Sequence, residues 1–300
     1  MTCGTGNQGN FETHVLAAQE CVYALKRLTA GYPPKALDMW ILEQFGPKKF
    51  QWGEDEALER CLQRTPSINR KEVLERAKTF RKEWKNACKK KDPLDIKVTN
   101  IGNTLTFGNS SHYVNRSILK KLHDSYKGEP SKFPHAAWAL THLYEMFLRV
   151  TGDGMQLSVP NKKYLKWAQK QNISLECFAS PFNHNLPRFC SALPIVDAPF
   201  GSLGSFFDID LKENAICNPP YTEEVLSAAF DRIEHALNNH PLLIIFVTPC
   251  WDDADAIIRA KACPYKIKEK VRRDFETNSI ANGISIVHPC DSYVFTFTSK

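Results

Sequence analysis

The tetrapeptide Asn218-Pro219-Pro220-Tyr221 stands between two different sequence patterns. A short apolar run, 215–217, precedes it, and residues 222–238 follow with the spacing of an amphipathic helix. This order predicts a strand, a stiff turn that lacks two backbone donors, and a helix. The wholly apolar run at 242–248 predicts a parallel strand buried on both faces. Strands and helices alternate from Leu175 onward, which predicts an α/β fold with a doubly wound sheet.

The turn itself carries the chemistry that the sequence suggests. In open α/β sheets, ligands bind beyond the carboxyl ends of the strands, where this turn is expected. Asn218 offers an amide oxygen and Pro219 a carbonyl oxygen, while Pro220 fixes the backbone and Tyr221 offers a flat ring face. Two acceptors and a ring suit a planar substrate whose NH2 group must be held in place. The alternative is a rigid turn with no chemical role.

The bulk composition excludes several classes of protein. No apolar run approaches the roughly 20 residues of a membrane span, and no secretory signal opens the sequence, so no membrane association is expected. The ten cysteines form no C-x-x-C pair. We therefore expect reduced thiols, no metal site, and a cytosolic or nuclear protein. The formal net charge of +6 favours a polyanionic partner.

The 300 residues are enough for one large α/β domain and a smaller one. We expect a helical, basic, RNA-binding domain at 1–95 and the α/β domain at 96–300. Between Arg70 and Lys91, ten basic residues stand against three glutamates. Phosphate contacts by residues such as Arg81 and Lys85 are one interpretation, and a solvated helix face is the other.

Three loops are expected to line the ligand site, namely 180–183, 200–208 and 218–221. The second is rich in glycine and serine, which permit close approach of the backbone to a ligand. Neither G-x-G-x-x-G nor G-x-x-x-x-G-K-[ST] is present, which argues against dinucleotide and nucleoside triphosphate sites. The absence of G-x-S-x-G disfavours nucleophilic hydrolysis.

Asn-Pro-Pro-Tyr after a strand resembles motif IV of class I methyltransferases that methylate amino groups with S-adenosylmethionine. The flanking sequence narrows the resemblance to the family of cap-specific adenosine N6-methyltransferases, the phosphorylated CTD-interacting factors. The resemblance covers about 104–262. It is carried by ECFASPFN at 176–183, FCSA at 189–192, FGSLG at 200–204 and IFVTPCW at 245–251.

The family implies a fold and a mechanism. The fold is a class I, Rossmann-like methyltransferase sheet, here with an N-terminal helical domain. Asn218 and the Pro219 carbonyl would accept the two N6 hydrogens of adenine, and Tyr221 would stack on the flipped-out base. S-adenosylmethionine would supply the methyl group, so catalysis would consist mainly of positioning and would need no metal.

The family also suggests further site residues. Ser180, Pro181, Asn183 and Asp208 are candidates for the cofactor pocket together with Asn218. Asp197 and Asp210 compete with Asp208 for the carboxylate that would bind the ribose. Glu223 and Trp251 are candidates for substrate contact, alongside Arg81 and Lys85. The alternatives are an ordinary acid at a helix N-terminus for Glu223 and a core residue for Trp251.

Capped RNA is the implied partner, and the nucleus the implied location, with the cytoplasm as the alternative. The C-terminal domain of RNA polymerase II is a further implied partner. The vertebrate family member has a WW domain, which no segment here fits, and Phe in place of Tyr221. Other functions remain open: methylation of adenine in DNA or of a glutamine amide in protein, or a non-catalytic module that binds RNA or an acidic tail.

Overall fold

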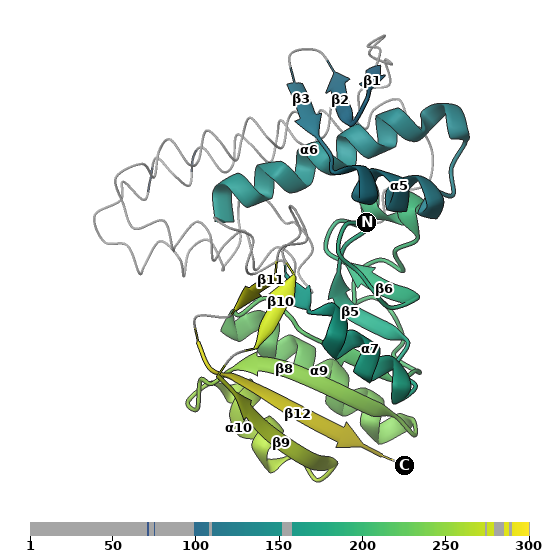
Figure 1. Cartoon of the computed structure of the whole chain (residues 1–300). Coiled ribbons are helices and arrows are strands. Elements are labelled where there is room, and N and C mark those ends of the chain that lie inside the picture. The colour runs from purple at the N-terminus through teal and green to yellow at the C-terminus, as the bar shows by residue number, and fades with distance from the viewer. Residues whose placement is uncertain are drawn as a thin grey trace. The chain divides into compact units, whose positions relative to one another are not determined.

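The structure is a computed structural model of the chain (Figure 1). It describes residues 71, 75, 99–107, 110–151, 158–273, 275–278, 285–287 and 290–299. These residues fall into two compact units: the first holds 99–123 and 128–151, and the second holds 124–127 and everything from 158 onward. The predicted domain at 1–95, including Arg81 and Lys85, lies outside the described residues except for Lys71 and Glu75, so its boundary stays a prediction.

The first unit combines a small antiparallel sheet with helices. A hairpin precedes residue 107: its first strand lies at 99–101 and the turn falls at Gly102-Asn103. Gly102 has φ +64°, which a residue without a Cβ adopts at little cost. The elements are β1 (Thr99–Ile101), β2 (Thr104–Phe107), β3 (Ser110–Tyr113), α5 (Arg116–Ser125), the 3-10 turn η2 (Pro130–Lys132) and α6 (Phe133–Thr151). The last two residues of α5 belong to the second unit.

The second unit is built on a six-stranded sheet with the order β6-β5-β7-β8-β12-β9 (Figure 1). The first four strands in this order pair in parallel, whereas β12 is antiparallel to both of its neighbours. The strands are β5 (Leu175–Ala179), β6 (Arg188–Ser191), β7 (Ala215–Cys217), β8 (Leu243–Pro249), β9 (Lys266–Arg272) and β12 (Ser292–Thr298).

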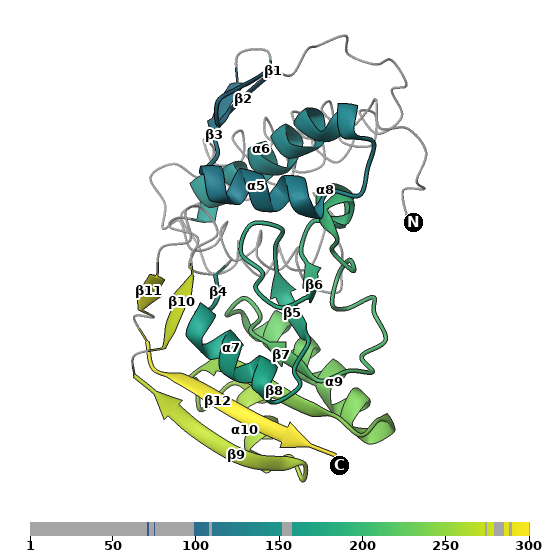
Figure 2. The same ribbon diagram turned by 45° about the vertical axis from the view of Figure 1, so that its right-hand side comes forward.

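Helices cover both faces of this sheet (Figure 2). Side chains alternate along each strand. Ile245 and Val247 pack with Leu165 on one face, whereas Ile244 and Phe246 lie in the cluster of α9 and α10 on the other. The predicted strand at 242–248, buried on both faces, is thereby confirmed as β8. The covering helices are α7 (Lys162–Lys170), α9 (Glu223–Asn239) and α10 (Asp255–Ala262), with the short α8 (Pro194–Asp197) and η4 (Ala198–Phe200) after β6.

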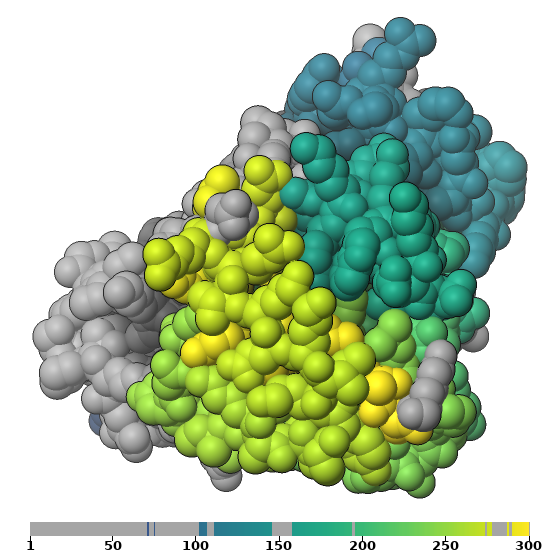
Figure 3. All heavy atoms as spheres, turned by 60° about the horizontal axis from the view of Figure 1, so that its bottom comes forward, coloured from purple at the N-terminus to yellow at the C-terminus, as the bar shows by residue number. Residues whose placement is uncertain are grey.

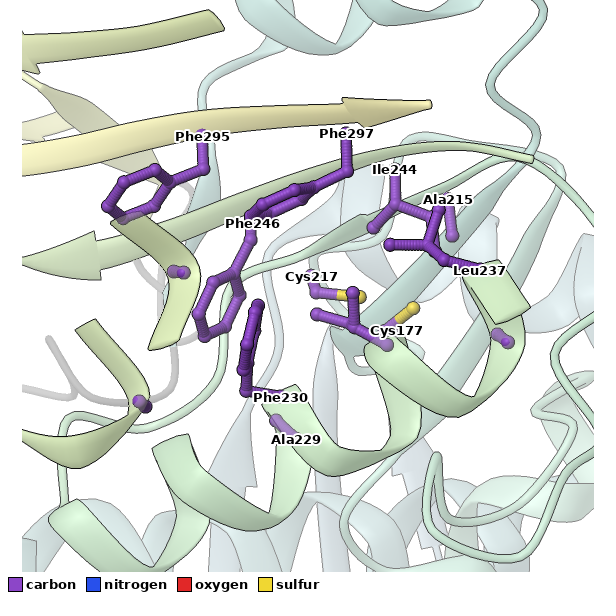
Figure 4. Close-up of a cluster of buried hydrophobic side chains, with 14 of the residues drawn as sticks. Cys177, Ala215, Cys217, Ala229, Phe230, Leu237, Ile244, Phe246, Phe295 and Phe297 are labelled. Carbon is purple, nitrogen blue, oxygen red and sulfur yellow. The ribbon is translucent and has the colours of Figure 1, made fainter. Parts of the chain in front are cut away.

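Aromatic rings and cysteines fill the core between the sheet and α9 (Figure 4). The ring of Phe230 stacks on that of Phe246 with centroids 5.7 Å apart, and its centroid is also 5.7 Å from that of Phe297. Cys177 and Cys217 are buried on neighbouring strands, and burial raises the pKa of the Cys177 thiol well above its ordinary value. All six cysteines among the described residues are free thiols.

Elements whose sequence lacks an apolar pattern were not predicted. The sequence of β9, KIKEKVR, is charged at most positions and exposed almost throughout, as an edge strand can be. A second small sheet, with the order β11-β10-β4, also belongs to this unit. Its strands are β4 (Val159–Pro160), β10 (Glu276–Asn278) and β11 (Ser285–Val287).

Candidate functional site

The site lies at the point in the sheet where successive strands are added first on one side of β5 and then on the other. From β5 the chain proceeds to β6 on one side, and then crosses to β7 on the other side of β5. The carboxyl ends of β5 and β7 are therefore adjacent, and the connections that leave them diverge. Open α/β sheets bind ligands at such a switch point. The segments that follow these two ends are 180–183 and 218–221, two of the three predicted loops.

Asn218 presents an unused acceptor at this point. Its side-chain Nδ2 donates to the carbonyl oxygen of Ser158 at 3.2 Å, which fixes the orientation of the amide. Its Oδ1 is buried and accepts no hydrogen bond from the described residues. A buried polar atom without a partner is costly, so this oxygen is available to accept a hydrogen bond from a ligand. The acceptor role of Asn218 stays a prediction, with which this buried oxygen is compatible.

The two prolines are buried and stiffen the turn. The Pro220 carbonyl accepts a hydrogen bond from the backbone N–H of Thr222 at 2.9 Å. The Pro219 carbonyl has no donor among the described residues. It is therefore available as the second acceptor, and its role in substrate binding stays a prediction. Thr222 then caps α9, since its Oγ1 accepts from the Val225 N–H at 3.3 Å.

Tyr221 and Trp251 lie next to each other. Their ring centroids are 6.4 Å apart with an interplanar angle of 72°, an edge-to-face contact between the ends of β7 and β8. Tyr221 is buried, whereas Trp251 is 37% exposed and so the more accessible of the two rings. Burial raises the pKa of the Tyr221 hydroxyl above its ordinary value, and the nearby Ser292 hydroxyl lowers it in part. Tyr221 is therefore a neutral ring at physiological pH.

The loop after β5 is a closed, buried turn. Asn183 Oδ1 accepts hydrogen bonds from the Ser180 backbone N–H at 3.0 Å and from Ser180 Oγ at 2.7 Å. Pro181 is buried between them. All three residues thus lie at the switch point as predicted, but the Asn183 oxygen serves to hold the turn. Their contact with a cofactor stays a prediction.

The three acidic candidates for the ribose differ in burial and in local partners. Asp208 is exposed, in a turn closed by the hydrogen bond from its own N–H to the Ser205 carbonyl (3.0 Å). Asp197 is fully buried, and its Oδ2 accepts from the Leu193 N–H at 2.9 Å. Asp210 faces His240, the C-cap of α9, and so lies at the amino edge of the sheet, opposite Asn218.

The glycine-rich loop at 200–208 owes its glycines to backbone conformation. Gly201 and Gly204 have φ +95° and +94°, a region that L side chains rarely adopt. A Cβ at Gly204 would meet no atom within 4 Å. The structure therefore explains these glycines without a close ligand.

The structure says less about the remaining predicted residues. Glu223 is exposed in the first turn of α9, two residues after Tyr221, where both a substrate contact and a favourable interaction with the helix dipole are possible. Arg81 and Lys85 lie outside the described residues. Within the described part of the chain, no group of three or more His, Cys, Asp or Glu could hold a metal ion. No helix in that part is long and apolar enough to cross a membrane.

Two residues that help to build the site were not predicted from the sequence. Ser158 holds the Asn218 amide from 60 residues earlier in the chain. Glu176 in β5 is buried, and its carboxylate accepts from the backbone N–H groups of Asn185 (3.1 Å) and Leu186 (3.4 Å). The only sequence signal for Glu176 is an acidic residue within an apolar strand pattern. No feature of the sequence around Ser158 marks it as part of the site.

Comparison with known proteins gives the family. Residues 116–281, more than half of the chain, match the family described as "Phosphorylated CTD interacting factor 1 WW domain". The chain belongs to this family. The matched residues of this phosphorylated CTD-interacting factor family member run from α5 through β10 and include five of the six strands of the large sheet. The resemblance inferred from the motifs is thereby confirmed.

Two relatives carry the name "mRNA (2'-O-methyladenosine-N(6)-)-methyltransferase". The mouse protein is 31% identical over 177 residues, which are 54% of this chain and 25% of the relative. The human protein is 31% identical over 153 residues, 48% of this chain and 22% of the relative. The chain thus matches about a quarter of the length of these relatives. The predicted class, a Rossmann-like methyltransferase sheet, agrees with the observed mixed α/β fold.

Proposed function

We propose that this chain transfers a methyl group to the N6 amine of an adenine in RNA. The observation that carries the proposal is the buried, unpartnered Oδ1 of Asn218, held by Ser158 at the carboxyl end of β7. An exocyclic amine has two hydrogens, and the site has two acceptors, this oxygen and the Pro219 carbonyl. The names of the mouse and human relatives support the same reaction.

The residues of the turn would act by orientation. When both N6 hydrogens are donated to fixed oxygens, the nitrogen lone pair points in one direction. Tyr221 and Trp251 offer ring faces and edges to a base that has left its stack. The new bond would join N6 to the methyl carbon, and the bond between that carbon and the donor sulfur would break, so that the donor would leave as a neutral thioether. The nitrogen would then lose one proton to water. This requires no general base with a shifted pKa, and the burial of neutral Tyr221 is compatible with it.

S-adenosylmethionine is the methyl donor that we propose, and when bound it supplies an electrophilic methyl group on a positively charged sulfur. The position of the site in the sheet supports such a donor. The Ser180–Asn183 turn and Asn218 flank the switch point, where an adenosine-bearing ligand binds in sheets of this class. Asn218, whose Oδ1 accepts no hydrogen bond from the described residues, directly follows β7. Ser180, Pro181 and Asn183 would hold the donor, and Asp208 is the proposed partner of its ribose.

We propose the 2′-O-methyladenosine next to the cap of an mRNA as the substrate, because the relatives are named for it. Action in the nucleus and an encounter with the C-terminal domain of RNA polymerase II follow as further proposals. The family description names the CTD interaction, which supports the second of these.

The test is a competition between substrate classes with a radiolabelled methyl donor. Capped RNA that begins with 2′-O-methyladenosine, the same RNA without a cap, single-stranded DNA and a glutamine-bearing peptide are offered together. We expect most of the label in the capped RNA and none after Asn218→Ala. Label in the peptide or the DNA instead would replace the proposed substrate, and binding of RNA without any transfer would indicate a non-catalytic module.

A further inference from the structure

One side of the second unit carries a row of basic residues that have no role in the proposed chemistry at Asn218. Helix α7 has the sequence KKYLKWAQK and contains no acidic residue. Its apolar residues Leu165 and Ala168 are buried against the sheet, so its lysines point outward. We define the basic face as the exposed residues Lys162, Lys163, Lys166 and Lys170 of α7 with Lys268, Lys270 and Arg272 of β9.

The strand register places the two groups on the same side of the sheet. Residues directly opposite each other in an antiparallel pair share a face. Lys270 lies opposite Val294, which packs in the same cluster as Leu165 of α7. Lys268 and Arg272, two residues away on either side, point the same way. In Figure 3 the teal atoms around α7 and the yellow-green atoms of β9 both reach the visible surface.

The charges of the basic face are not neutralised. Among the described residues, no ion pair engages any lysine of α7, or Lys268 or Lys270. By contrast, Lys266 pairs with Glu269 at 3.0 Å. Glu269 lies opposite Phe295 and therefore on the other face of the edge strand. Glu276, whose carboxylate accepts from Asn161 Nδ2 at 2.7 Å, is an acid beside the start of α7. A row of cations that form no ion pair among the described residues is the electrostatic footprint of a polyanion partner.

An aromatic ring stands among these lysines. Trp167 is 44% exposed, and its ring centroid is 5.2 Å from that of Tyr164. Surfaces that bind single-stranded nucleic acid combine cations along the backbone with exposed rings on which bases stack. An anionic membrane is a poorer match, because the apolar face of α7 is already buried in the core.

The basic face begins beside the candidate site. Ser158, whose carbonyl holds the Asn218 amide, is followed by Val159 and Pro160 of β4, and Lys162 is the first residue of α7. Four residues span at most about 14 Å, even when fully extended. A nucleic acid with one base at Asn218 could therefore continue directly onto α7.

We propose that the basic face binds the phosphates of single-stranded RNA on either side of the methylated nucleotide, with Trp167 stacking on one base. This inference rests on the proposed RNA substrate. Phosphate contacts carry no sequence information, so the face would position the RNA and leave the choice of nucleotide to the site.

The test measures RNA binding and its salt dependence in the full chain. The variant Lys166→Gln/Lys268→Gln/Lys270→Gln removes three charges from the basic face. The matched control, Lys132→Gln/Arg188→Gln/Lys212→Gln, removes three exposed charges that are each already paired with an acid, at 3.7, 2.8 and 2.6 Å. Fluorescence anisotropy with a single-stranded RNA of about 20 nucleotides reports affinity between about 50 and 200 mM salt.

We expect the basic-face variant to bind RNA at least about tenfold more weakly, with a salt slope smaller by about two, since each contact on a single strand contributes about 0.7. The control should stay within about twofold of wild type, because each of its cations is already paired with an acid. Trp167→Ala should cost at least about fivefold in affinity with an unchanged slope, and Trp167→Phe much less.

Equal affinities and slopes in both triple variants would overturn the proposal. So would loss of binding to vesicles that contain phosphatidylserine while RNA binding is retained, because the face would then serve a membrane. Failure of the proposed function gives a different result. If wild type transfers no methyl group to RNA but the basic-face variant alone loses RNA affinity, the inference about this face still stands.

Discussion

The Asn218 amide donates to the Ser158 carbonyl at 3.2 Å, across a sequence separation of 60 residues. This bond determines which atom of the amide remains available for another hydrogen bond. With Nδ2 engaged, the buried Oδ1 remains as an acceptor without a partner among the described residues. Because β4 pairs with β10, the position of Ser158 depends on the small sheet as well as on the motif. The turn motif alone therefore does not orient its own asparagine.

Substitution of Asn218 should separate its two hydrogen bonds. Asn218→Ala removes both the acceptor and the contact with Ser158, and we expect the single-turnover rate of methyl transfer to fall by about 100-fold or more. Asn218→Asp keeps an acceptor but places a carboxylate against the Ser158 carbonyl, so we expect a smaller loss. Rapid-quench assays and thermal melting measure both effects. A wild-type rate in Asn218→Ala with unchanged melting would contradict the acceptor role.

The ring of Tyr221 should matter more than its hydroxyl. Tyr221→Phe preserves the edge-to-face contact with Trp251, whereas Tyr221→Ala removes it. Since stacking of one base is worth about 1–3 kcal/mol, Tyr221→Ala should reduce kcat/KM by about tenfold or more. Steady-state kinetics of both variants on the same capped RNA give the two kcat/KM values to compare. Equal losses would assign the role to the hydroxyl and its neighbour Ser292.

Burial of Tyr221 also predicts a dependence of stability on alkaline pH. Its pKa is raised by burial, so above about pH 10 the unfolded chain loses this proton while the folded chain keeps it. The free energy of unfolding should then fall as pH rises, by up to about 1.4 kcal/mol per pH unit for this group. Urea titrations at pH 8, 9, 10 and 11 should show a shallower alkaline fall in Tyr221→Phe. Parallel curves for wild type and variant would refute this.

The basic segment from Arg70 to Lys91 gives a separate prediction about long RNA. Reversing Arg81, Lys82 and Lys85 should raise KM for long capped RNA and flatten its salt dependence, if this predicted helix contacts phosphates. A cap dinucleotide lacks those phosphates and serves as the control substrate. An unchanged salt slope on long RNA would identify the segment as a solvated helix face.

The sequence predicted the elements whose pattern is local. Strand β7, the turn at Asn218 and the start of α9 were located to within a residue, because an apolar run, two prolines and the cap Thr222 all lie within a few positions. The edge strand β9 was missed because its side chains are exposed and show no apolar alternation. The hydrogen bond from Asn218 to Ser158 could not be predicted, because it depends on how distant segments pack.

The most direct test of the central claim is the position at which a methyl group appears. Capped RNA that begins with 2′-O-methyladenosine is incubated with the protein and S-adenosylmethionine carrying a deuterated methyl group, digested to nucleosides and analysed by mass spectrometry. We predict the label on the adenine base at N6, at the first nucleotide, with wild type and not with Asn218→Ala. Label on the ribose, on another ring nitrogen, or equally with both proteins would contradict the account.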